Sequence, residues 1–147
     1  MKKNIFYLVI VCAVFLITPE LSFAQNRATN IVNVQELKIK WPENGTPEER
    51  DSLLSIYVEN VVKKNEHIVS HREYAHFFTS DNHDYLVIEE YKDMDGLEAS
   101  FRRTTELENQ AWPDETKRKE FFKLLDSYFE NWHGDHLYRM NPKLSKN

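Results

Sequence analysis

Two histidines and a carboxylate stand close together near the end of the sequence, in His133-Gly134-Asp135-His136. Two imidazoles and one carboxylate can bind a zinc-like ion if a turn brings them together. A histidine can also act as a general base, since its pKa lies near neutral pH. The structural alternative is a helix end, where Gly134 terminates the helix and Asp135 bonds backbone amides. The spacing matches no established zinc signature, so we expect no metal and retain His133 as a catalytic candidate, with Asp135 and His136 as ligand-binding candidates.

A second group of candidates follows from the alternation of residues along a strand expected over 68–79. Five side chains two residues apart share one face of this strand: Ser70, Arg72, Tyr74, His76 and Phe78. Glu89, on the next expected strand, is a candidate partner for Arg72 and His76, although a register that differs by one residue replaces it with Glu90. An Arg–Glu–His set can bind an acidic ligand or move a proton. The alternative is a polar network that fixes the sheet register or faces solvent.

The elements that position these residues follow from hydrophobic periodicity and helix caps. In chain order we expect a strand over 31–41, a helix over 46–64, strands over 68–79 and 85–92, helices over 95–112 and 114–134, and a short strand over 136–140. Thr46-Pro47-Glu48-Glu49 is a strong helix start, because Thr46 can cap, Pro47 suits the first helical position and Glu49 can close a capping box. The order β-α-β-β-α-β is the ferredoxin-like arrangement, an α+β fold in which helices cover one face of an antiparallel sheet.

The last helix is expected to carry the core aromatic stripe of Phe121, Phe122, Leu125, Tyr128, Phe129 and Trp132. The other face of the sheet has no helix to cover it. A monomer would expose aromatic residues there, Tyr74 and Phe78 among them. We therefore expect a homodimer that packs two sheets face to face.

The N-terminus has the three parts of a secretory signal peptide. Lys2 and Lys3 precede an apolar run from Ile5 to Thr18, and Ser22-Phe23-Ala24 has small residues at the positions a signal peptidase requires. The run is shorter than the roughly 18–20 residues that span a membrane, which disfavours an anchor. We expect cleavage after Ala24, a single domain over 25–140, a flexible tail over 141–147, and a secreted or periplasmic protein with no membrane span.

Composition removes several classes of function. The chain has 147 residues, 41% hydrophobic, and a net charge of −5, which gives no basic footprint for nucleic acid. Its one cysteine, Cys12, lies in the expected signal peptide, so the domain has no disulfide and no thiolate nucleophile. No Gly-rich phosphate loop, nucleophile elbow or metalloprotease helix is present, and we expect no cofactor.

Two local stretches and the element order carry a resemblance to a known superfamily. The stretches are residues 80–84 leading into Val87-Ile88-Glu89-Glu90-Tyr91-Lys92, and residues 133–138. Over most of residues 31–140 the chain resembles the dimeric α+β-barrel superfamily, which includes antibiotic biosynthesis monooxygenase-like proteins, and within it secreted bacterial members of unassigned function. The resemblance implies a pocket between the sheets of a dimer, used for oxygenation without a cofactor, haem degradation or ligand binding.

Two functions fit that resemblance. The first is a homodimeric module that binds a small apolar or aromatic molecule, with Arg72, Tyr74, Phe78 and Glu89 at the pocket. The alternative is a cofactor-independent monooxygenase-like or haem-related enzyme in which His76 or His133 moves the proton. Fold likeness alone does not decide between them.

Overall fold

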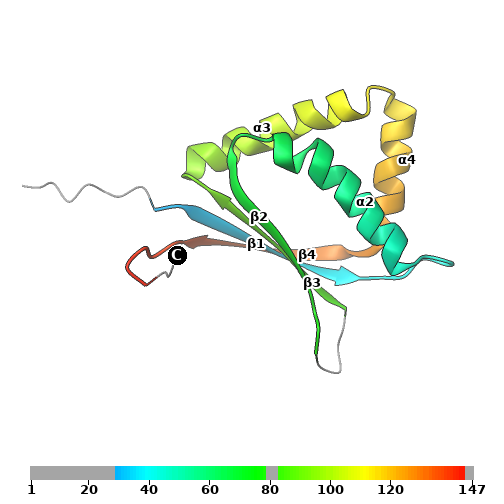
Figure 1. The fold of residues 1–147 in the computed structure, drawn as a ribbon, viewed down its shortest axis with the longest axis horizontal. Coiled ribbons are helices and arrows are strands. Elements are labelled where there is room, and N and C mark those ends of the chain that lie inside the picture. The colour runs from blue at the N-terminus through cyan, green and yellow to red at the C-terminus, as the bar shows by residue number, and fades with distance from the viewer. Residues whose placement is uncertain (1–28, 79–82, 145–147) are drawn as a thin grey trace, which may run out of the picture.

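The computed structural model describes residues 29–78 and 83–144. In chain order the elements are β1 (Ile31–Ile39), α2 (Pro47–Asn60), the short 3-10 helix η1 (Val62–Lys64), β2 (Ile68–Ala75), β3 (Asp84–Tyr91), α3 (Met94–Ala111), α4 (Glu115–Asp126) and β4 (Phe129–Arg139). The four strands form one sheet in the order β2-β3-β1-β4, with every neighbouring pair antiparallel. The helices cover one face of this sheet (Figure 1). The predicted ferredoxin-like α+β fold is confirmed.

Each long helix begins at a side-chain cap. The Thr46 side chain accepts a hydrogen bond from the Glu49 amide at 3.2 Å, and Pro47 follows as the first helical residue, as predicted. Asp93 caps α3 by accepting from the Gly96 amide at 2.8 Å, and Asp114 caps α4. The caps satisfy amides that the first helical turn leaves unpaired.

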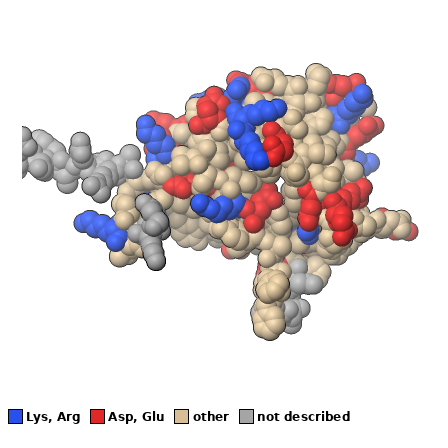
Figure 2. Space-filling view, viewed as in Figure 1, with Lys and Arg blue, Asp and Glu red and all other residues tan. Residues whose placement is uncertain are grey.

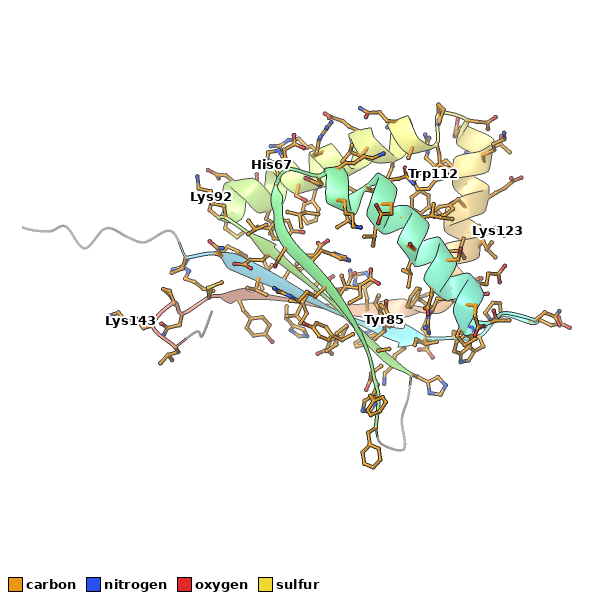
Figure 3. All side chains as sticks on the ribbon, in the orientation of Figure 1. His67, Tyr85, Lys92, Trp112, Lys123 and Lys143 are labelled. Carbon is orange, nitrogen blue, oxygen red and sulfur yellow. The ribbon has the colours of Figure 1, made fainter. Side chains whose placement is uncertain are left out.

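The apolar core lies toward one end of the helix layer. Leu53 of α2, Leu125 of α4 and the fully buried Tyr128 form its centre, with Leu54 and Phe121 packed against them. Where α3 meets α4, Trp112 stacks on Phe121 at a centroid distance of 4.3 Å and meets Phe122 edge-on at 5.6 Å. Figure 3 labels Trp112 in the helix layer and Tyr85 in the sheet layer beneath it.

The predicted extent of the last helix is wrong. It ends at Asp126, and β4 begins at Phe129 and runs through the positions expected to end the helix. Tyr128 ends the helical run because it is buried among α2 residues, where its hydroxyl bonds Glu49 and accepts from the Thr46 amide. From Phe129 onward the chain instead gains a ladder of hydrogen bonds along β1, and aromatic residues suit such a strand.

Some sequence-based predictions fall outside the described residues. These are the signal peptide over 1–24, residues 79–82 of the loop between β2 and β3, and residues 145–147 of the C-terminal tail. Within the described part, none of the helices combines the length and hydropathy needed to cross a membrane.

Candidate functional site

The sheet face beneath the helices carries polar residues where a purely structural sheet would carry apolar ones. Directly opposite residues in the ladders share a face, so Asn33 lies with Glu89 and His71 in one row, and Gln35 lies with Val87 and Glu73 in the next. Burial of such groups costs free energy unless each finds a partner. Their position under the helix layer marks this face as the candidate site.

These residues line a cavity of about 580 Å³ between the sheet and the helices. Its helical wall includes Leu54, Tyr57, Ser100, Phe101 and Thr104. Concave sites with apolar walls and a few placed polar groups are the usual form of a small-molecule site. We refer to this space as the inner cavity.

Five side chains form a hydrogen-bonded chain along the sheet wall of the inner cavity. His71 Nε2 lies 2.9 Å from Glu73 Oε1, and His71 Nδ1 lies 2.9 Å from Glu89 Oε1. The Tyr85 hydroxyl donates to Glu73 Oε2 at 2.5 Å, and the Tyr91 hydroxyl donates to Glu89 Oε2. Each carboxylate oxygen therefore has one hydrogen-bonding partner and keeps acceptor capacity for a second.

Hydrogen bonds among these five side chains set their charges. Burial alone would lower the pKa of His71, but hydrogen bonds to Glu73 and Glu89 outweigh it and raise that pKa to about 9. For Glu73, burial would raise the pKa, yet hydrogen bonds from His71 and Tyr85 hold it below its ordinary value. Burial first, and then Glu89, raises the pKa of Tyr91, and burial with Glu73 does the same for Tyr85. At neutral pH an imidazolium thus lies between two carboxylates, and two neutral phenols donate to them.

The helical wall adds its own polar contacts. The Tyr57 hydroxyl lies 3.3 Å from Glu108 Oε1, and burial raises the pKa of Glu108. Nearby, the buried Asn65 amide donates to the Ser100 carbonyl and hydroxyl and to the Thr104 hydroxyl, at 3.0 to 3.1 Å. These contacts hold η1 against α3 and fix the position of the wall.

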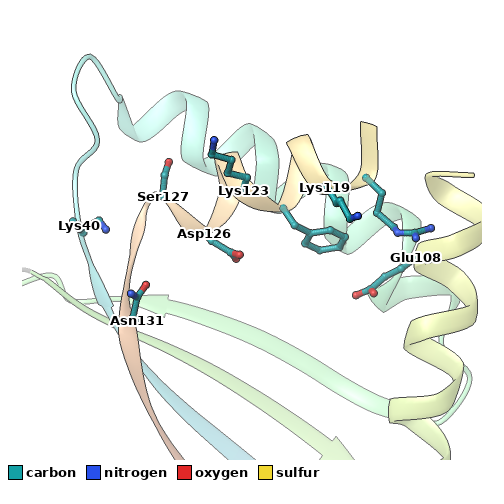
Figure 4. Close-up of a pocket in the computed structure, with 9 residues that line it drawn as sticks. Lys40, Glu108, Lys119, Lys123, Asp126, Ser127 and Asn131 are labelled. Atoms are coloured by element: carbon teal, nitrogen blue, oxygen red, sulfur yellow. The ribbon is translucent and has the colours of Figure 1, made fainter. Parts of the chain in front are cut away.

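A second hollow, of about 540 Å³, adjoins the inner cavity between α4 and the end of β1. Asp126 and Asn131 line both spaces. Figure 4 shows Asp126 and Glu108 pointing into this hollow from opposite sides. The basic residues in the lining of this hollow are Lys40, Arg118, Lys119 and Lys123. The inner cavity, by contrast, includes no lysine or arginine in its lining and carries the carboxylates of Glu73, Glu89, Asp126 and Glu130.

The expected partnership of Glu89 with Arg72 and His76 is wrong. Arg72 is paired with Ile88 and Tyr74 with Leu86, so both lie on the sheet face away from the helices, whereas Glu89 lies beneath the helices. The alternative register, with Glu90 on the face of Arg72, is the observed one. Glu89 nevertheless lines the inner cavity and remains a ligand-binding candidate.

His76 and Phe78 lie beyond the end of β2. The His76 amide donates to the Asp84 carbonyl at 2.9 Å, and His76 lines a hollow of about 430 Å³ with Tyr74 and Leu86 on the side away from the helices. Phe77 and Phe78 are 97% and 84% exposed. In Figure 2 the described part of this hairpin projects below the sheet as a tan surface, with no Lys, Arg, Asp or Glu marked on the side in view.

The C-terminal histidine group lies in the middle of β4, so its interpretation as a helix end is wrong. His133 and Asp135 share a face, with His133 Nδ1 2.8 Å from Asp135 Oδ2, and His133 lines the inner cavity. His136 falls on the opposite face because successive strand residues alternate. Among residues 29–78 and 83–144 no three His, Cys, Asp or Glu side chains are placed to hold a metal ion.

Sequence reasoning missed the inner-cavity residues Asn33, Gln35, His71 and Glu73. A signal was present: each interrupts an otherwise apolar face of its strand at an odd-numbered position. The sequence does not show how the strands are aligned, however, so it could not show that these positions meet.

A chain with this topology and a cavity beneath its helices belongs to the class of ferredoxin-like α+β proteins. No protein-family model and no curated protein matches its sequence. Solved structures do match its fold. A mutant of SnoaB, a cofactor-independent oxygenase from Streptomyces nogalater, is 13% identical, with a TM-score of 0.52 over 81% of this chain and 100% of that chain. A conserved protein from Methanosarcina mazei is 19% identical, with a TM-score of 0.50 over 78% of this chain and 96% of that one.

Proteins described as antibiotic biosynthesis monooxygenases are also among the matches, one of them from Caulobacter crescentus at 12% identity, with a TM-score of 0.49 over 78% of this chain and 92% of that one. The matches to SnoaB and to the Methanosarcina mazei protein confirm the resemblance predicted from the sequence as a likeness of fold.

Proposed function

We propose that this chain is an exported, homodimeric protein that binds a small molecule with an apolar or aromatic body in the inner cavity of each protomer. One observation carries the proposal: the helix-covered sheet face carries His71, Glu73 and Glu89 among its apolar residues, and they line a cavity of about 580 Å³. A sheet that served packing alone would gain stability from apolar residues at these positions.

The polar wall defines the complementary ligand. The side chains of His71, Glu73 and Glu89 are only 14%, 22% and 19% exposed, and their hydrogen bonds to one another hold them in place. Both carboxylates can accept a further hydrogen bond, so the ligand would present a hydroxyl or N–H group to the sheet. Its apolar body would lie against the helical wall, beside Leu54 and Phe101.

The homodimer rests on the sheet face that no helix covers. Tyr74, Trp132 and Tyr138 are 48%, 56% and 55% exposed there, which is costly for a protein that stays monomeric. A second copy that packs against this face would bury them. Export rests on the sequence of residues 1–24.

A cavity-filling substitution tests the binding site. Val87 lies at the centre of the inner-cavity wall, so Val87→Phe would occupy ligand space without adding charge. The probe is N-phenyl-1-naphthylamine, a neutral aromatic amine whose fluorescence rises in apolar sites. We expect saturable binding to the wild type and at least about tenfold weaker binding to Val87→Phe, because the filled cavity excludes the ring.

The matched control is Thr105→Phe, which places the same ring on the exposed side of α3. It should bind the probe like the wild type, and circular dichroism should show both variants folded. Equal binding by Val87→Phe and the wild type, or no saturable binding to the wild type, would contradict the proposal.

The hydrogen-bonded chain favours one alternative, oxygenation without a cofactor, the activity described for SnoaB. Glu73 and Glu89 offer carboxylate oxygens that can accept a proton from a bound phenol. With 1-naphthol as probe, one atom of dioxygen would enter at ring carbon 4 as a carbonyl and the other would leave as water, giving 1,4-naphthoquinone. Oxygen uptake that depends on the wild-type protein and is lost in Glu89→Gln would support this activity.

The haem-related alternative would depend on His133. An iron ligand needs a ring nitrogen that is available to the cavity. Both ring nitrogens of His71 are engaged by carboxylates, whereas His133 has only Nδ1 on Asp135, which leaves Nε2 for a metal. The His133 side chain is 51% exposed, so the cavity does not enclose it as a haem pocket would.

A further inference from the structure

The sheet face away from the helices, called here the uncovered face, carries two opposite charges that are not paired with each other, Arg72 and Glu36. Its rows follow from the ladders: Arg72 lies beside Ile88 and Val34, and Tyr74 lies beside Leu86 and Glu36. Arg72 and Glu36 are both exposed. The side chains between them, Leu86 and Ile88, are apolar.

The two charges do not pair within one protomer. Arg72 is on β2 and Glu36 is on β1, with β3 between them, so at least two strand spacings, roughly 10 Å, separate their backbones. The Arg72 guanidinium only approaches the Ser70 hydroxyl, at 3.4 Å. Glu36 makes no hydrogen bond or ion pair with another residue of the described ranges.

Two other carboxylates on this face are already engaged. Asp84 forms an ion pair with Lys38 at 2.5 Å. Glu90 is one row from Arg72, but its two oxygens accept hydrogen bonds from Asn30 and Ser70. Glu36 is therefore the carboxylate of the uncovered face that has capacity for a strong new partner.

A second copy of this chain offers an oppositely charged partner to both Arg72 and Glu36. In a two-fold dimer the same surface is presented twice, so that if one residue contacts another across the axis, the reverse contact also forms. Burying an unpaired charge against an apolar face is costly, whereas pairing it with an opposite charge offsets much of that cost. A face that presents Arg72 and Glu36, which are oppositely charged and not paired with each other, is complementary to itself.

We propose that two copies pack through their uncovered faces in a register fixed by two reciprocal ion pairs, Arg72 of each with Glu36 of the partner subunit. This inference rests on the proposed homodimer and adds its register. The midpoint between the two residues lies on β3, between Leu86 and Ile88. The two-fold axis lies between the two sheets and parallel to them, and it passes over this midpoint at right angles to the line from Arg72 to Glu36. The apolar side chains of both copies then meet near the centre, and the ion pairs flank them.

Charge reversal tests the register. The dimer dissociation constant is measured by sedimentation equilibrium for the wild type, Arg72→Glu, Glu36→Arg and the double variant. Each single reversal places like charges together twice per dimer, and we expect about a tenfold or larger rise in the dissociation constant. The double variant restores opposite charges and should return to within about threefold of the wild type. The control Arg102→Glu, exposed on α3, should leave the constant unchanged.

The outcomes separate this inference from the proposed function. Single variants that dimerise like the wild type, or a double variant no tighter than the singles, would overturn the ion pairs while the homodimer stands. A wild type that stays monomeric at every concentration would overturn the homodimer and the ion pairs together. Ligand binding in the inner cavity is measured independently and is unaffected by either result.

Discussion

The hydrogen-bonded chain in the inner cavity makes folding stability depend on pH in a defined direction. His71 lies between Glu73 and Glu89 at 2.9 Å from each, and these contacts raise its pKa to about 9. In the unfolded chain a histidine titrates near pH 6.5. Because the folded pKa is the higher one, the stabilisation is fully present below about pH 6.5 and is lost as the pH rises through about 9.

The size of the effect follows from the two pKa values. Each tenfold difference in proton affinity corresponds to about 1.4 kcal/mol, so a change from 6.5 to about 9 gives roughly 3 kcal/mol. The His71 side chain is 14% exposed, and solvent screening reduces this to roughly 2–3 kcal/mol. Urea unfolding at fixed protein concentration, at pH 6.0, 7.5 and 9.5, should show the free energy of unfolding falling by about that amount.

The variant His71→Gln supplies the control. It should be less stable than the wild type at pH 6 and lose most of the decline between pH 6 and 9.5, since glutamine does not titrate. An NMR titration that places the His71 pKa at or below 6.5, or a decline equally steep in His71→Gln, would refute the reasoning.

On the acid side, Glu73 has a lowered pKa. Its contribution to the free energy of unfolding is therefore present above about pH 4.5 and is lost as the pH falls further.

Two further variants, one single and one triple, probe the walls of the inner cavity. Asn65→Ala removes the amide that bonds Ser100 and Thr104 and leaves buried acceptors unpaired, so chemical denaturation should show a loss of about 1–3 kcal/mol; a loss within error of zero would contradict it. Replacing His71, Glu73 and Glu89 together by leucine should leave the free energy of unfolding at pH 7 unchanged or raise it, while abolishing binding of N-phenyl-1-naphthylamine. A strongly destabilised triple variant would show that the polar chain serves the fold instead of a ligand.

The element order could be predicted because its signals are local. The caps at Thr46 and Asp114 and the alternation in β1 and β3 depend on residues a few positions apart. The end of α4 could not be predicted in this way. The helical spacing of aromatic residues continues past Asp126, but Tyr128 is held among α2 residues and the chain turns into β4.

The candidate site was harder to predict because it depends on strand register. Glu89 and His133 were selected from the sequence and do line the inner cavity, but each was expected beside the wrong neighbours. His71 and Glu73 were missed because the alternation that selects Arg72 and Tyr74 places them on the opposite face. Choosing between the two sets requires knowing which face the helices cover, and tertiary packing determines that.

Adjacent residues in this sheet therefore lie on opposite faces with different surroundings. Glu89 faces the inner cavity and Glu90 faces away from the helices, as Gln35 and Glu36 do on β1. The polar groups of the inner face lower the free energy of unfolding compared with apolar residues, which is expected where a site must recognise a ligand. The uncovered face carries exposed aromatic side chains, and Glu36 has no partner there among the described residues, which is expected where a second copy completes the surface. Since a shift of one residue in either central strand would exchange these roles, both the proposed ligand site and the proposed dimer depend on the register of β1 against β3.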